Sequence, residues 1–148
     1  GQELKKHLLN VVDLDMQAFN KIIDARRLPK GSDAEKEARE QAIELANKEA
    51  TEVPLGVVEL GRELLSLARQ VVEGGNPNSL SDGGVAALAA LAAAEGAYYN
   101  VLINLQAFEE DGPCGAYRAE IRARAGSAIE AVRAEAETIR QAVLAKLS

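Results

Sequence analysis

The chain has 148 residues, of which 47% are hydrophobic and 3% aromatic, and its 17 Lys and Arg against 23 Asp and Glu give a formal net charge of −6. This length suits one domain with one core, and the acidic balance argues against nucleic acid as a partner, which would call for a basic surface. No uninterrupted apolar run reaches the roughly 18 residues of a membrane-spanning helix, so we expect no membrane segment.

Cysteine and histidine occur once each, as Cys114 and His7. This excludes a disulfide framework and argues against a zinc site of the usual Cys/His kind, so we expect no metal. The polar N-terminal sequence does not resemble a signal peptide. We therefore expect a cytoplasmic protein in which any catalysis rests on carboxylates, amides, hydroxyls and basic side chains.

Hydrophobic periodicity predicts an all-α fold, an antiparallel bundle of about five helices without strands. Pro54 should break or kink the chain between the second and third helices. Gly74 and Gly75 should end the third helix, and Ser79 with Asp82 suggests a capping-box variant that opens the fourth. The expected helices cover about residues 3–28, 33–51, 54–72, 79–108 and 116–148.

One face of the predicted fourth helix carries small and polar residues at spacings of three and four. A stripe of this kind lets another helix approach closely, within the chain or across a dimer. Its two amides and one carboxylate need partners, either protein groups or a ligand. The members of this stripe are Asp82, Ala86, Ala89, Ala93, Gly96, Asn100 and Asn104.

The first helix carries two acids with different expected surroundings. Asp13 and Asp15 point about 200° apart, because successive helical residues are separated by about 100°. Asp15 falls within the apolar face and Asp13 on the polar side. We therefore expect Asp15 to face the core, where it is either a general acid–base group or a structural carboxylate that caps a helix or pairs with an arginine. The apolar face consists of Leu4, Leu8, Val11, Val12, Phe19, Ile22 and Ile23.

Each other candidate also has a structural explanation. Asp82 would favour the helix dipole at the start of its helix. Asn100 and Asn104 could bond to facing backbone, and Arg27 and Lys30 could complement the end of the first helix or bind an anionic ligand tail.

Five sequence blocks, in order, resemble a known family, the cyclodeaminase domain of formimidoyltransferase-cyclodeaminase and the related methenyltetrahydrofolate cyclohydrolases. The resemblance extends from the N-terminus through the predicted fourth helix. The blocks are Val-Asp-Leu-Asp-Met-Gln-Ala-Phe-Asn, Arg-Leu-Pro-Lys, Ala-Thr-Glu-Val-Pro-Leu, Gly-Asn-Pro-Asn-Ser-Leu-Ser-Asp-Gly-Gly-Val-Ala-Ala and Gly-Ala-Tyr-Tyr-Asn-Val-Leu-Ile-Asn-Leu.

This resemblance implies a homodimeric or larger helical assembly that acts on a tetrahydrofolate substrate, without a further cofactor, and that can accompany a formimidoyltransferase domain. The expected reaction closes 5-formimidoyltetrahydrofolate to 5,10-methenyltetrahydrofolate and releases ammonia, as an ammonia-lyase. The family's motif residues fall on Asp15, Ser81, Asp82, Asn100 and Asn104. We assign Asp15 and Asp82 to catalysis and the other three to substrate binding.

Arg27 and Lys30 complete the expected site as ligands of the folate glutamate tail. Asp82 and Asn100 lie 18 residues apart on one helix, or about 27 Å. They cannot touch the same carbon within one chain, which favours a site at a dimer interface.

The chain, taken as one domain over residues 1–148, departs from the family pattern because it starts after a Pro-Gly-Gly-Gly-Ser segment that relatives carry upstream. It is then either a fragment or a short form with incomplete catalysis. Two alternatives to the cyclodeaminase remain: a methenyltetrahydrofolate cyclohydrolase, and a non-catalytic helical dimerisation module. Folate binding distinguishes the two enzymes from the dimerisation module, which should bind none. Ammonia release distinguishes the cyclodeaminase from the cyclohydrolase.

Overall fold

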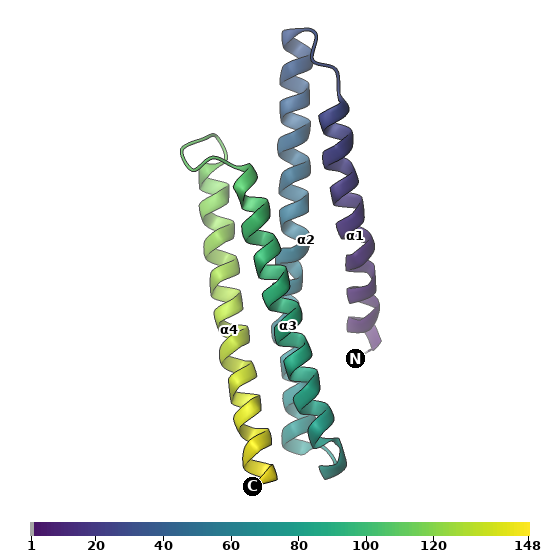
Figure 1. The fold of residues 1–148 in the computed structure, drawn as a ribbon, viewed down its shortest axis with the longest axis vertical. Coiled ribbons are helices and arrows are strands. Elements are labelled where there is room, and N and C mark those ends of the chain that lie inside the picture. The colour runs from purple at the N-terminus through teal and green to yellow at the C-terminus, as the bar shows by residue number, and fades with distance from the viewer. Residues whose placement is uncertain (1) are drawn as a thin grey trace.

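The computed structural model describes residues 2–148, with the side chains of Leu4 and His7 outside the description. It contains four long helices: α1 (Gln2–Arg27), α2 (Asp33–Gly74), α3 (Leu80–Asn104) and α4 (Gly115–Leu147) (Figure 1). Two short 3-10 helices, Pro77–Ser79 and Leu105–Ala107, lie at the two ends of α3. Over these described residues there is no strand, so the all-α prediction is confirmed, while the number of helices is four rather than five.

The expected break at Pro54 is wrong. Pro54 is buried within α2, and the second and third predicted helices form one helix of 42 residues. Proline in a helix leaves the carbonyl four residues earlier without its usual N–H donor. Here that carbonyl belongs to Ala50, and it accepts a hydrogen bond of 2.8 Å from Asn104 Nδ2 of α3. A donor from a neighbouring helix therefore lets α2 continue through the proline.

The N-termini of α2 and α3 differ in how they are capped. Ser32 caps α2 in a capping box: its hydroxyl accepts from the Glu35 N–H, and the Glu35 carboxylate accepts from the Ser32 N–H. Ser79 makes no side-chain cap hydrogen bond, so the capping box predicted with Asp82 is wrong. The physical reason is that Ser79 belongs to the preceding 3-10 turn, where the Asn76 side chain accepts from the Asn78 N–H instead.

The core forms where α2, α3 and α4 meet. Helices α2 and α4 supply the large side chains, including the fully buried Leu65 and Ile129, and α3 supplies small ones. A Cβ at Gly61 of α2 would lie 3.1 Å from Ala94 Cβ of α3, so these two helices approach closely. The small residues buried on α3 are Gly83, Ala87, Ala90, Ala94 and Ala97.

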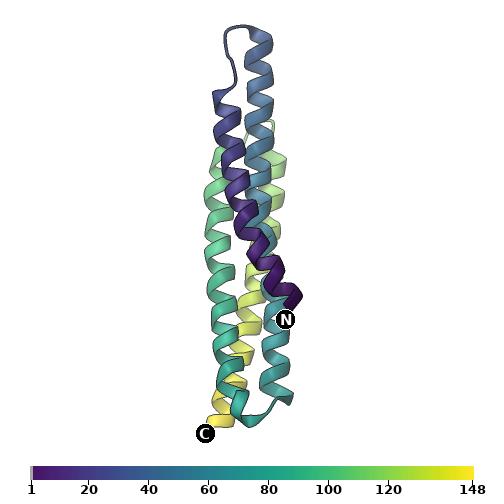
Figure 2. The same ribbon diagram turned by 90° about the vertical axis from the view of Figure 1, so that its right-hand side faces the viewer.

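Helix α1 packs along the N-terminal part of α2, the part that follows the α1–α2 turn (Figures 1 and 2). Among the described side chains of α1, those of Ala18 and Ala25 are buried. Both α1 and α3 run antiparallel to α2 and therefore parallel to each other (Figure 1). This arrangement places one face of α1 and one flank of α3 on either side of α2.

By length and average composition, the segment Pro77–Ala107 meets the criterion for a membrane-spanning helix. The expectation of no membrane segment was based on uninterrupted apolar runs alone, whereas this criterion averages hydropathy over 18 residues. The indication is weak, because the core helix of a soluble protein meets the same criterion. Only 28% of its most apolar stretch is buried, so much of this apolar helix faces outwards in the single chain.

Candidate functional site

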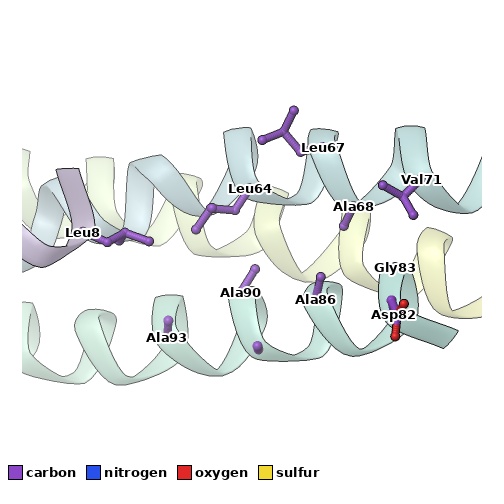
Figure 3. Close-up of a pocket in the computed structure, with 11 residues that line it drawn as sticks. Leu8, Leu64, Leu67, Ala68, Val71, Asp82, Gly83, Ala86, Ala90 and Ala93 are labelled. Carbon is purple, nitrogen blue, oxygen red and sulfur yellow. The ribbon is translucent and has the colours of Figure 1, made fainter. Parts of the chain in front are cut away.

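An apolar groove of about 560 Å³ lies between α2 and α3 and is closed at one end by Leu8 of α1 (Figure 3). Leu64, Leu67 and Val71 of α2 form one wall, and small residues of the predicted stripe form the other. Among the described residues that line the groove, Asp82 is the one with a charged side chain. An apolar slot with one polar end suits a flat ring that carries polar groups at its edge.

Asp82 lies in the first turn of α3, at the end of the groove away from Leu8 (Figure 3). Its side chain is exposed, so its carboxylate is available to a ligand or a second chain. The next residue, Gly83, is buried against α2: a Cβ there would lie 2.7 Å from Val72 Cγ2. This close approach fixes the position of Asp82 relative to the groove.

Asp15 is exposed in the single chain, which corrects the expectation that it faces the core. The helical phase explains the difference. The buried face of α1 contains Ala18 and Ala25, and Asp15 lies about 60° from Ala18 and about 80° from Ala25, given about 100° per residue. The apolar arc of α1 is wider than the strip that α2 covers, so Val12 and Phe19 also remain exposed, at 59% and 62%.

The register of α1 and α3 nevertheless brings Asp15 and Asn100 to the same level. Leu8 and Ala93 lie at the same end of the groove (Figure 3). Asp15 and Asn100 each follow by seven residues, which is two turns on the same helix face and about 10 Å. Because α1 and α3 are parallel, both residues lie beyond this end of the groove, on the two helices that flank α2.

Asn104 has a structural role in the single chain. Its amide nitrogen donates to the Ala50 carbonyl that Pro54 leaves without a donor. This hydrogen bond agrees with the structural alternative for Asn104, in which its amide bonds to facing backbone. Asn100, one turn earlier, is exposed and is the stripe amide that remains available.

We predict that Asn104→Ala lowers the free energy of unfolding by about 1–3 kcal/mol, the usual cost of leaving a buried carbonyl without a donor. Pro54→Ala would restore an N–H within α2, so the same substitution should cost less in that background. Urea unfolding of both single variants and the double variant measures this coupling. Asn100→Ala is the matched control and should change stability little. Equal costs of Asn104→Ala with and without Pro54 would contradict this role.

The remaining predicted ligands lie away from the groove. Ser81 is exposed on the other flank of α3, where it lines a second groove, formed with α4. Arg27 lies about 18 Å along α1 from Asp15 and pairs with Asp24 at 3.7 Å. Lys30 is exposed in the α1–α2 turn. The structure therefore places Asp15 and Asn100 at the same height beyond one end of the groove. It does not bring Ser81, Arg27 or Lys30 to this place.

A polar cluster between α2 and α4 was not predicted from the sequence. Lys48 Nζ bonds to Glu44 Oε1 at 2.6 Å and lies 5.3 Å from the centre of the Tyr117 ring. Burial and the nearby Glu52 carboxylate raise the pKa of Tyr117 to about 12. A hydrogen bond to Glu44, together with burial, raises the pKa of the Cys114 thiol. This thiol therefore stays protonated near neutral pH and is a poor nucleophile.

Within residues 2–148, apart from the undescribed His7 side chain, no group of three His, Cys, Asp or Glu side chains could hold a metal ion. The described groove offers one carboxylate, that of Asp82, at one end, and the side chains of Asp15 and Asn100 lie beyond the other end.

Comparison with known proteins gives consistent matches. The family model described as "Formiminotransferase-cyclodeaminase" matches residues 1–123. A methenyltetrahydrofolate cyclohydrolase of Methylorubrum extorquens is 40% identical over 110 residues, which cover 74% of this chain and 53% of that protein. The formimidoyltransferase-cyclodeaminase of Sus scrofa is 33% identical over 132 residues, which cover 89% of this chain and 24% of that protein. The matched part of the chain thus spans about half of the first relative and about a quarter of the second.

Proposed function

Because the chain belongs to the formiminotransferase-cyclodeaminase family, we propose that it acts on the one-carbon unit held between N5 and N10 of a tetrahydrofolate. The proposed reaction is the ring closure of 5-formimidoyltetrahydrofolate to 5,10-methenyltetrahydrofolate with release of ammonia. The observation that supports it best is the common level of Asp15 and Asn100 beside an apolar groove. The groove would hold a flat ring, and the two polar side chains would meet its reacting edge.

The proposed reaction moves protons and requires no metal or redox cofactor. N10 attacks the carbon of the protonated, amidinium-like formimidoyl group on N5. N10 then gives up its proton, the departing NH2 group takes one proton and leaves as ammonia, and the positive charge of the substrate remains on the product as a delocalised cation. A carboxylate can carry the proton between the two nitrogens and then stabilise the positive charge. We assign this role to Asp15 and assign the orientation of the pterin amide to Asn100.

The second candidate is the cyclohydrolase reaction, in which water adds to the methenyl carbon and the ring opens to 10-formyltetrahydrofolate. It is favoured by the 40% identity to a relative named for this activity. The same carboxylate could accept the proton from the attacking water. The proposal for either reaction includes a cytoplasmic homodimer, and for the cyclodeaminase it includes a formimidoyltransferase domain as a partner, as the names of the longer relatives indicate.

We predict ammonia release and formation of 5,10-methenyltetrahydrofolate when the protein is given 5-formimidoyltetrahydrofolate. An ammonia assay and the ultraviolet absorbance of the methenyl product measure this reaction. Turnover of 5,10-methenyltetrahydrofolate to the 10-formyl compound, without ammonia release from the formimidoyl substrate, would assign the cyclohydrolase instead. The absence of binding to either folate by calorimetry would contradict both enzymes and favour a helical interaction module.

A further inference from the structure

The outward face of α3 is apolar, and no described part of the single chain covers it. Four large side chains on this face are more than half exposed: Val85 at 65%, Leu88 at 59%, Tyr99 at 56% and Ile103 at 60%. Between them lie alanines and Gly96, and the face carries few charges. A contiguous exposed apolar surface of this kind typically marks an interaction site.

We propose that α3 pairs in antiparallel orientation with α3 of a second copy, about a two-fold axis near Ala93, and that the partner subunit's Asp82 thereby completes the site of Asp15 and Asn100. This inference rests on the proposed folate function for its catalytic meaning. The pairing itself follows from the distribution of side chains along α3.

The large residues of this face are arranged symmetrically about one point. At a two-fold interface, residue i contacts residue j and residue j contacts residue i, so contacting residues lie at equal distances from the axis. The midpoint of Leu88 and Tyr99 falls between residues 93 and 94, and the midpoint of Val85 and Ile103 falls at residue 94. One axis therefore pairs each large apolar side chain with another large apolar side chain.

The centre of the same face is built for close approach. Ala89, Ala92, Ala93 and Gly96 lie there, and all four are exposed. A Cβ at Gly96 would meet no atom within 4 Å in the single chain. Glycine in a helix costs about 1 kcal/mol relative to alanine, and the single chain gives no steric reason for it. A second α3 that crosses at this point would supply that reason.

The same axis would bring Asp82 of one subunit close to Asn100 of the other. Within one chain, Asp82 and Asn100 are about 27 Å apart. The midpoint of Asp82 and Asn104 is residue 93, so the partner subunit's Asp82 would lie level with Asn104, about one turn from Asn100. A two-fold axis perpendicular to the helices keeps this residue on the flank that faces α1, where Asp15 lies.

Cysteine cross-linking tests this register without any need for activity. In a background with Cys114→Ser, Leu88→Cys and Tyr99→Cys chains are prepared separately, mixed and oxidised, and the products are identified by mass spectrometry. We expect the mixed disulfide to form at least about 10-fold faster than either self-disulfide, because two Leu88 positions would be about 16 Å apart, beyond the span of a disulfide. Ala123→Cys, at an exposed position of α4, is the control for cross-linking by random collision.

A predominant Leu88→Cys self-disulfide would overturn the proposal in favour of a parallel pairing. Cross-linking no faster than the Ala123→Cys control would overturn any α3 pairing. If the cysteine variants cross-link as expected but the wild-type protein does not turn over folate, the pairing stands and the proposed function is contradicted.

Mixing two inactive chains tests the shared site. Asp15→Asn and Asp82→Asn chains are each expected to be nearly inactive, and exchange of subunits between them should restore about a quarter of wild-type turnover, because half of the dimers then hold one intact site of two. A site contained within one chain would show no recovery, and that result would overturn the contribution of the partner subunit's Asp82.

Discussion

Replacing Asp15 by Asn is expected to lower folate turnover by about 10²-fold or more, the usual scale for the loss of a general acid–base group. Asparagine keeps the shape of the side chain but cannot take up and release the proton that must pass between the two nitrogens. Since Asp15 is exposed in the single chain, the substitution should leave the melting temperature nearly unchanged. Turnover and thermal unfolding of the same preparation measure both effects.

Asp13→Asn is the matched control. Asp13 is also exposed on α1, but it points about 200° away from Asp15 and so faces away from α3. It should change neither turnover nor stability. A loss of turnover with Asp13→Asn but not with Asp15→Asn would contradict the helical phase on which the site depends. A fall in melting temperature with Asp15→Asn at normal turnover would show that this carboxylate is structural.

The sequence predicts the helical class and most helix ends because the signals for these are local. Ser32 and Gly75 lie next to the backbone groups that they cap, so their effects can be read from a few neighbouring residues. Pro54 shows where local reading fails. Whether a proline breaks a helix depends on whether another group satisfies the carbonyl that it leaves free, and here that group is 54 residues away along the chain.

The site was predicted in part for a similar reason. Periodicity places Asp15 within the apolar arc of α1, but it does not tell which portion of that arc α2 covers. The packing of Ala18 and Ala25 against α2 decides this, and it leaves Asp15 at the edge of the contact. Periodicity also places Asn100 and Asn104 on one stripe, yet only the approach of α2 shows that Asn104 bonds to Ala50 while Asn100 remains free.

Replacing Gly96 by Leu is expected to raise the dissociation constant of the homodimer by about 10²-fold or more. A side chain at an overpacked position costs about 1–3 kcal/mol, and the two-fold axis introduces it twice in each dimer. The monomer should be unharmed, because Gly96 faces open space and leucine favours a helix more than glycine does. Sedimentation over a range of protein concentrations measures the dissociation constant, and circular dichroism measures the helix content.

Gly126→Leu provides the matched control, since a Cβ at Gly126 of α4 also meets no atom within 4 Å. It should gain the same helix propensity and leave the dimer unchanged. If the site is shared between subunits, Gly96→Leu should also lower turnover at dilute protein and recover part of it as the concentration rises, because association restores the partner subunit's Asp82. A Gly96→Leu protein that remains dimeric at the wild-type dissociation constant would show that the centre of α3 is not the interface.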